Sequence, residues 1–531
     1  MKHLVAIACC LLAARALAAD IERPNLIVVL SDDVGLSRVG CYGGGPFLTP
    51  NLDRMAATGL RFERCYSMPL CGPSRSALLC GKYPFRTGAT TNNNSAIDPG
   101  RHRTIANVLR EAGYATCAVG KLGQSAGEDD PAAPGRLGFD ESMLWMGRGT
   151  PDRYWHPRYY RNGEVFQGTP EEYGPDKTHE FLVDFMDRHR DEPFFVYYSA
   201  VLTHVPIVPT PDSAPGESDP RQLVIDMVSY LDKQMGLLMD DLDRLGLRDD
   251  TIILFTSDNG PYGNPLGTVG GKPIQGVKGD LLEGGVREPL IVNCPKRVTS
   301  GRVSDDLVDF TDFFPTVLDL AGVGVPEGLT LDGRSFAPQV LGEKGAAREW
   351  VYAQVGREHF IADSRFKLYG DGRFVDITES PVAEKPVPEG DAEGIEAKGR
   401  LAMALAKLRA GIPDSPDAGP SGAGLKPPPL TPEQWKADLA LLTERKVIDD
   451  PTPWVELKGD LDGAEVAALI QRAAGIFEPV NGAGQAIAVF QREGILNSPA
   501  YWTEHAREGR QCNAGNVTRL LQKLAMRLRA R

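Results

Sequence analysis

The sequence predicts an α/β fold in which a mainly parallel sheet is flanked by helices. Residues 25–30, 193–199 and 251–256 form runs of β-branched and aromatic residues that are apolar along almost their whole length. Such runs are typical of strands buried on both faces of a parallel sheet. Segments with the apolar spacing of helices lie between them, and strands that alternate with helices usually pair in parallel.

The rest of the large domain, expected at residues 19–340, follows the same alternation. After the first strand we expect a helix at 50–59, a strand at 60–66, a helix at 105–112, a strand at 114–119, and helices at 180–189, 223–245 and 310–320. The helix at 223–245 is the clearest of these, because its apolar residues recur at helical spacing.

A small antiparallel subdomain is expected at residues 341–410. Short alternating segments at 350–355, 366–369 and 374–377 precede a helix at 400–408. Strands this short and this close in sequence favour hairpin pairing.

The C-terminal part of the chain predicts a linker followed by an α-helical repeat module. Residues 411–432 are rich in Pro, Gly and Ser and cannot bury a core. Within the module, at 433–531, residues 439–454 align without a gap with 487–502, and a helix at 466–474 matches one at 517–525. A duplicated helical unit is more typical of a binding or spacer module than of an enzyme, so contact with a cell surface or a polymer is the expected partner.

The net charge of the chain argues against nucleic acid as a partner. The 531 residues carry a formal net charge of −13, whereas a nucleic-acid partner requires a basic face. An anionic substrate must therefore be attracted by a local positive site, because the field of the whole protein repels it.

The N-terminus predicts export. Residues 1–18 read as a signal peptide cleaved after Ala18, and their apolar run is too short to cross a bilayer. No later stretch predicts a transmembrane segment, so a secreted or periplasmic location is expected. Seven cysteines would remain after cleavage, and their pairing is left open. None has the Cys-x-x-Cys spacing of a zinc site.

Acidic and amide side chains follow two of the predicted buried strands. Asp32 and Asp33 come after the first strand, and Asp258 and Asn259 follow the strand at 251–256. The carboxyl ends of strands in open α/β sheets are where ligands bind. An all-oxygen cluster suits Ca²⁺ or Mg²⁺ better than zinc. Taken singly, either pair is explained equally well as a turn.

The segment Cys71-Gly72-Pro73-Ser74-Arg75 is followed by a short apolar helix ending at Gly81. A cysteine with a cation four residues later is a candidate nucleophile, although a buried packing cysteine is the commoner case. This segment resembles the defining motif of the formylglycine-dependent sulfatases, which have an alkaline-phosphatase-type fold. The resemblance extends over most of residues 23–408.

The resemblance implies a set of site residues. A formylglycine-generating enzyme would oxidise Cys71 to an aldehyde whose hydrate is the nucleophile, and Ca²⁺ is favoured over Mg²⁺ as the cation. The implied catalytic residues are Cys71, Arg75, Lys121, His204, Lys278 and Asp258, the last as a proton acceptor. The implied metal ligands are Asp32, Asp33, Asp258, Asn259 and an oxygen of the oxidised Cys71.

One position departs from the family pattern. Many members carry Gly-Lys-Trp-His, whose histidine is thought to serve the release of sulfate. This chain has Gly120-Lys121-Leu122-Gly123, so no histidine stands at Gly123, and the neighbouring Gln124 cannot act as a base.

The expected function is hydrolysis of a sulfate monoester, on a sulfated small molecule or carbohydrate, to an alcohol and inorganic sulfate. A phosphatase or phosphodiesterase of the same fold is the first alternative, against which Cys71 argues. A non-catalytic relative that binds sulfated glycans is the second, because of Gly123. The substrate's alcohol half is not readable from the sequence. Four aromatic residues either stack on a sugar or pack in the core: Trp145, Tyr154, Trp155 and Tyr159.

Overall fold

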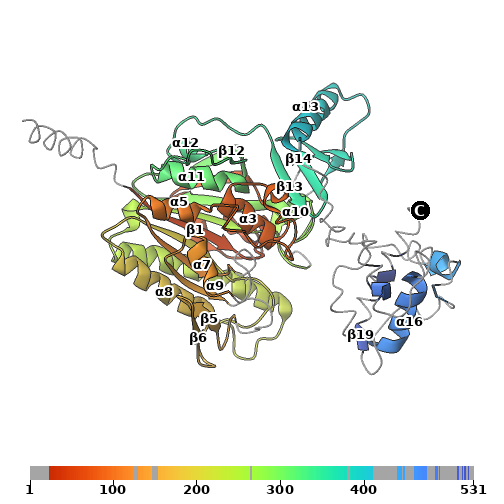
Figure 1. Ribbon diagram of the computed structural model, residues 1–531, viewed down its shortest axis with the longest axis horizontal. Coiled ribbons are helices and arrows are strands. Elements are labelled where there is room, and N and C mark those ends of the chain that lie inside the picture. The colour runs from red at the N-terminus through yellow and green to blue at the C-terminus, as the bar shows by residue number, and fades with distance from the viewer. Residues whose placement is uncertain are drawn as a thin grey trace, which may run out of the picture. The chain divides into compact units, whose positions relative to one another are not determined.

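The computed structural model divides into two compact units (Figure 1). One unit comprises the chain up to Gln354 together with His359–Ala410, and the other comprises Val355–Glu358 with Gly411–Arg531. The structure describes residues 23–122, 130–145, 153–263, 266–379 and 383–410, and parts of 439–524. The expected signal peptide and linker lie outside these residues.

A ten-stranded sheet forms the centre of the first unit. Its strand order is β12-β2-β11-β8-β1-β7-β3-β4-β5-β6. The five strands from β8 to β4 pair in parallel, as expected for the four that the sequence predicted, and β4 is an additional strand. Their bounds are Thr251–Ser257 for β8, Asn25–Ser31 for β1, Phe194–Ser199 for β7, Ala115–Gly120 for β3 and Glu141–Trp145 for β4.

The sheet as a whole is mixed rather than mainly parallel. β11 (Arg287–Asn293) lies antiparallel between β8 and β2 (Leu60–Tyr66), and β12 (Arg302–Asp309) completes this edge parallel to β2. β5 (Arg158–Arg161) and β6 (Glu164–Gln167) extend the opposite edge as antiparallel strands. β2 was expected, whereas β5, β6, β11 and β12 were not; β5, β6 and β12 contain many polar residues and so lack the apolar run that marks a buried strand.

Two groups of helices cover the sheet (Figure 1). One group consists of α2 (Pro50–Ala57), α8 (Gly174–Arg188) and α9 (Pro220–Arg244), whose apolar side chains share a core with β1 and β8. The other contains α3 (Cys71–Cys80), α5 (Ile105–Glu111) and α11 (Phe313–Leu320). The expected helices are all present, although α8 begins at Gly174 rather than at residue 180.

The expected small antiparallel sheet is also present. It has five strands, β13 (Val351–Val355), β14 (Glu358–Ala362), β15 (Phe366–Tyr369), β16 (Phe374–Asp376) and β17 (Lys385–Pro386), and α13 (Ala392–Leu408) packs on it. Before β13, the buried Arg348 donates to both carboxylate oxygens of Asp312 in the large domain, at 2.6 Å. On β15, the buried Lys367 donates to Glu283 at 3.0 Å and to the Leu281 carbonyl oxygen at 2.7 Å. The small sheet therefore holds the segment that follows Lys278.

The second unit has a core to which both copies of the repeat contribute. Leu439 and Ile487 occupy matched positions in the two copies, as do Val466 and Val517, and all four are buried in one cluster. β18 (Asp460–Asp462) pairs antiparallel with β19 (Gln511–Asn513), the matched segment of the second copy. The register of this pair is symmetric, because Asp460 lies opposite Asn513 and Asp462 opposite Gln511. The tryptophans of the repeat lie outside the described residues.

None of the helices in the described part of the chain has the length and apolar character needed to cross a bilayer.

A carboxyl group is buried inside the sheet at Glu288 of β11. Its side chain is fully buried, and its Oε1 lies 3.5 Å from Ser67 Oγ. Burial first, and then the charge of Asp258, raise the pKa of Glu288 well above its ordinary value. Glu288 therefore keeps its proton at pH values where an exposed glutamate is charged.

This shift predicts a pH-dependent stability. Because the folded-state pKa of Glu288 lies above the unfolded value, the stabilisation by its proton is present at low pH and is lost as pH rises from about 4.5 through the folded pKa. A Glu288→Gln variant stays neutral at this position. The difference between its free energy of unfolding and that of the wild type should therefore grow in favour of the variant from about pH 5 to about pH 8, by up to ~1.4 kcal/mol per pH unit. Urea unfolding at both pH values measures this difference. Glu343→Gln, at an exposed acid, is the control, and parallel pH profiles for all three proteins would contradict the assignment.

Candidate active site

Polar side chains follow the carboxyl ends of four adjacent parallel strands of the sheet. Asp32 and Asp33 follow β1, and Asp258 and Asn259 follow the neighbouring β8. The register pairs Ser31 with Ser257, so Asp32 and Asp258 start from adjacent positions. On the other side of β1, β7 leads into the loop of His204, and β3 ends directly before Lys121.

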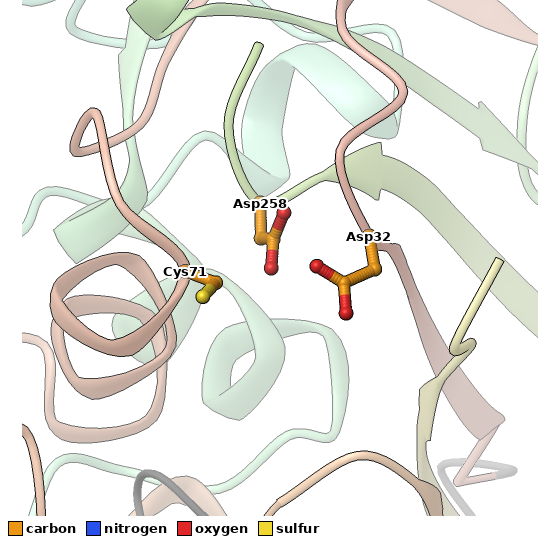
Figure 2. A group of neighbouring side chains, drawn as sticks. All are labelled: Asp32, Cys71 and Asp258. Atoms are coloured by element: carbon orange, nitrogen blue, oxygen red, sulfur yellow. The ribbon is translucent and has the colours of Figure 1, made fainter. Parts of the chain in front are cut away.

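Cys71 is the first residue of α3, and the turn before it is fixed by hydrogen bonds. Ser74 Oγ accepts from the backbone N–H of Met68 at 3.1 Å and donates to the Met68 carbonyl oxygen at 2.8 Å. The fully buried Cys71 side chain lies beside the carboxylates of Asp258 and Asp32 (Figure 2). The Cys71 Sγ atom and one carboxylate oxygen from each aspartate lie within 4.8 Å of one another.

Three cations pair with the three carboxylates. The fully buried Arg75 donates from Nη2 and Nε to Asp258 Oδ2, at 2.6 and 3.1 Å. Lys121 Nζ donates to Asp32 Oδ2 at 2.6 Å. Lys278 Nζ donates to Asp33 Oδ1, also at 2.6 Å. The cluster is thus a buried network in which each carboxylate has its own cationic partner.

The two aspartates closest to Cys71 have opposite pKa shifts. Burial alone would raise the pKa of Asp32, but Lys121, His204, Arg75 and Lys278 hold it well below its ordinary value. Burial and then the charge of Asp32 raise the pKa of Asp258 to about 7, against Arg75 and Lys121. A charged and a protonatable carboxyl therefore face the same space at neutral pH.

His204 lies at the edge of this cluster, with its Nε2 4.0 Å from Asp33 Oδ2. Burial first, and the cations Lys121 and Lys278, lower the pKa of His204 to about 4, so the ring is neutral at neutral pH. Arg153 Nη1 lies 2.8 Å from His204 Nδ1. Arginine only donates, so this contact favours the tautomer with the ring proton on Nε2. Nδ1 is also 2.7 Å from the Val205 carbonyl oxygen, a contact that favours the other tautomer.

Three oxygen atoms of the cluster are suited to bind a cation. Asp32 Oδ1, Asp33 Oδ2 and Asn259 Oδ1 are buried and accept no hydrogen bond from the described residues. Buried oxygens are rarely left without a partner, because burying an unpaired polar atom is costly. The Asn259 amide is oriented by its Nδ2, which donates to Asp33 Oδ1 at 2.7 Å. The donor set is therefore suited to a hard divalent cation.

The aromatic residues, the Gly123 segment and the cysteines singled out in the sequence differ in what the structure shows of them. Trp145, Tyr154 and Tyr159 are buried, so they pack in the core, while Trp155 is partly buried and donates to the Pro209 carbonyl oxygen at 2.8 Å. The segment with Gly123 and Gln124 lies outside the described residues. Among the cysteines whose side chains the structure describes, none forms a disulfide: these are Cys41, Cys65, Cys71, Cys80, Cys117 and Cys294.

Sequence reasoning missed two residues near the site. Arg153 contacts His204 as described, and its guanidinium lies 3.9 Å from the ring centre of Trp145. Asn92 Oδ1 lies 3.6 Å from Cys71 Sγ. Neither position stands at a motif spacing, and only the folded chain brings it to the site. The run of polar residues around Asn92 was the only available signal.

Comparisons with known proteins agree with this geometry. The family model described as Sulfatase matches residues 24–323. N-acetylgalactosamine-6-sulfatase of Canis lupus familiaris is 34% identical over 364 residues, covering 62% of this chain and 68% of that protein. Arylsulfatase A of Homo sapiens is 32% identical over 380 residues, covering 64% and 72%. The solved structure of Ps i-CgsB in complex with k-i-k-neocarrahexaose superposes with a TM-score of 0.64 at 26% identity, covering 72% of this chain and 92% of that one.

The chain spans about two thirds of the length of these two curated relatives. The family match covers more than half of the chain and includes the strands, the Cys71 helix and the cationic loops of the site. The chain therefore belongs to the sulfatase family and is a sulfuric ester hydrolase.

Proposed function

We propose that this protein is an exported sulfatase that hydrolyses a carbohydrate sulfate monoester through a formylglycine made from Cys71. The observation that carries the proposal is the convergence of Cys71 Sγ with Asp32 and Asp258, surrounded by buried cations. An uncharged pocket would not hold a sulfate, whereas Arg75, Lys121 and Lys278 supply fixed positive charge in a water-poor space. Formylglycine at residue 71 would supply a hydrate, one hydroxyl of which attacks sulfur while the other later drives the release of sulfate.

The metal ligands in this proposal are Asp32, Asp33, Asp258 and Asn259, together with the oxidised residue 71. The support is the set of three unpartnered buried oxygens described above. All donors are oxygens, which suits Ca²⁺ or Mg²⁺, and the resemblance to the sulfatases favours Ca²⁺ over Mg²⁺. When bound, the cation would neutralise carboxylate charge and stabilise the charge of the sulfate group.

Asp258 is the proposed proton acceptor for the attacking hydroxyl. It lies beside Cys71, where its carboxylate is within reach of a hydroxyl of the hydrated residue. Arg75 holds the same carboxylate through two donors, which fixes its orientation. Asp258 is therefore a proton acceptor whose orientation is fixed by a cationic neighbour.

His204 and the two lysines have proposed roles toward the sulfate ester. Lys121 and Lys278 would contact its peripheral oxygens, because both ammonium groups lie at the carboxylate cluster. A neutral His204 with its proton on Nε2 would donate a hydrogen bond to the sulfate or to the leaving oxygen. Fixed donors of this kind stabilise charge that develops as the S–O bond breaks.

A carbohydrate is the proposed substrate class, on the basis of two similar proteins, an N-acetylgalactosamine-6-sulfatase and Ps i-CgsB, whose structure was solved in complex with k-i-k-neocarrahexaose. Export is proposed from the sequence of residues 1–18.

Replacement of Cys71 tests the nucleophile. Cys71→Ala should reduce turnover of a small sulfate ester by roughly 10⁴-fold or more, because the attacking group is gone. Cys71→Ser should become trapped as a sulfated protein, visible by intact mass, because a serine ester has no second hydroxyl. Cys80→Ala, at the other end of the same helix, is the matched control and should keep its turnover rate. Full activity of Cys71→Ala would sink the proposal.

Removal of one carboxylate tests the metal site. Asp33→Asn should lower metal affinity by about 100-fold or more, because the ligand charge no longer balances the cation. Elemental analysis after dialysis and titration calorimetry with Ca²⁺ measure this. Asp53→Asn, an isosteric change in the first turn of α2 outside the cluster, should bind the metal like the wild type. Zinc in the purified protein, or full activity after exhaustive chelation, would count against a hard-cation site.

Truncation tests the proposed division into a catalytic part, residues 19–410, a linker and a repeat module. A chain that ends near residue 415 should hydrolyse a small soluble sulfate ester at close to the full-length rate, because the cluster lies within the first unit. Activity on a polymeric sulfated glycan should fall, because a tethered binding module raises the effective concentration of substrate. Loss of small-ester turnover in a truncated protein that is still folded would show that the division is wrong.

A further inference from the structure

A loop that comes 20 residues after Cys71 closes over the start of its helix. The residue before α3 is Leu70, whose side chain makes no capping hydrogen bond. Asn92 Oδ1 takes this role by accepting the backbone N–H of Gly72 at 2.9 Å. The first turn of α3 is thus capped by a distant segment instead of by its own neighbour.

Gly72 makes this close approach possible. A Cβ atom at this position would lie 2.5 Å from Ser95 Cβ and 3.0 Å from Asn92 Oδ1. Contact this short with a side-chain carbon would push the loop away from the helix. A side chain at position 72, the x of the Cys-x-Pro-Ser-Arg segment, is therefore incompatible with the observed position of Asn92.

The loop is also held independently of Asn92. Asn94 Oδ1 accepts from the backbone N–H and the Oγ1 of Thr91, at 2.7 and 2.8 Å. Asn94 Nδ2 donates to Thr90 Oγ1 at 3.1 Å. A change at Asn92 thus leaves these bonds of the turn in place.

The oxygen that caps the helix is the same one that faces the Cys71 side chain. Asn92 Oδ1 lies 3.6 Å from Cys71 Sγ, a distance at which the thiol donates a hydrogen bond. The carboxylates of Asp32 and Asp258 also lie close to Sγ (Figure 2). The side chain of residue 71 therefore has a neutral acceptor and two carboxylates as separate neighbours.

We propose that Asn92 is a positioning residue that holds one hydroxyl of the hydrated residue 71, leaving the other to the carboxylates. This inference rests on the proposed oxidation of Cys71. A carboxamide cannot take up a proton at neutral pH, so Asn92 orients the hydroxyl by accepting its hydrogen bond and does not act as a base. Because the hydrate has a hydroxyl donor that the aldehyde lacks, Asn92 also favours the hydrate in the resting enzyme.

Carbon-13 NMR of protein labelled at Cβ of cysteine tests this inference in the resting enzyme. The Cβ resonances of aldehyde and hydrate at residue 71 are well separated, so their ratio is read directly. Asn92→Ala should lower the hydrate-to-aldehyde ratio by about tenfold, the effect of one net hydrogen bond. Asn92→Asp, which keeps an oxygen acceptor at this place, should restore it.

Measurements of kcat and of melting temperature distinguish a positioning role of Asn92 from a role as a helix cap. Asn92→Ala should lower kcat by about tenfold with little change in KM, since the sulfate contacts remain. Thr104→Ala, which removes the N-cap side chain of α5, is the control: it should lower the melting temperature but leave the hydrate ratio and kcat unchanged. If Asn92→Ala behaves like Thr104→Ala in both measurements, Asn92 is only a helix cap and the inference is wrong.

Peptide mass spectrometry of each variant shows whether Cys71 is oxidised to the same extent. Equal oxidation with an unchanged hydrate ratio would overturn the role of Asn92 and leave the proposed function intact. Absence of oxidation in the active wild-type protein would instead overturn the proposed function.

Discussion

The balance of charge at a water-poor edge of the sheet is the constraint on which the site depends. Three carboxylates follow two neighbouring strands, and burial without partners would force them to take up protons. Arg75, Lys121 and Lys278 oppose this, because each lies 2.6 Å from one carboxylate, and the pKa of Asp32 is thereby held below its ordinary value. The same cations then form the positive surroundings that a sulfate requires in a protein of net charge −13.

The surrounding architecture serves this balance. Parallel pairing of β8 and β1 brings the acidic residues together, and the turn at Ser74 sets Cys71 opposite to them. The small sheet contributes from the outside, because the buried Lys367 binds Glu283 and the Leu281 carbonyl oxygen directly after the loop of Lys278. Elements far apart in the sequence are therefore needed to keep one cluster of charges in place.

Much of this could be predicted from the sequence, because apolar runs mark buried strands and polar residues directly after them mark the ligand-binding edge. The antiparallel direction of β11 could not be predicted, because the composition of a strand is the same whether it pairs in parallel or antiparallel. Asn92 and Arg153 were missed because their contacts are made between loops without a fixed spacing. Glycine at position 72 did carry a signal, but its meaning depends on the loop at residues 91–95, which only the fold brings close.

The most direct test of the account is the chemical state of residue 71 in active protein purified from its native host. Mass spectrometry of the proteolytic peptide that contains this residue measures it without any substitution. The account predicts a peptide in which the thiol has been replaced by an aldehyde, which a hydrazine reagent would label. Fully active protein whose peptide contains only unmodified cysteine would contradict it.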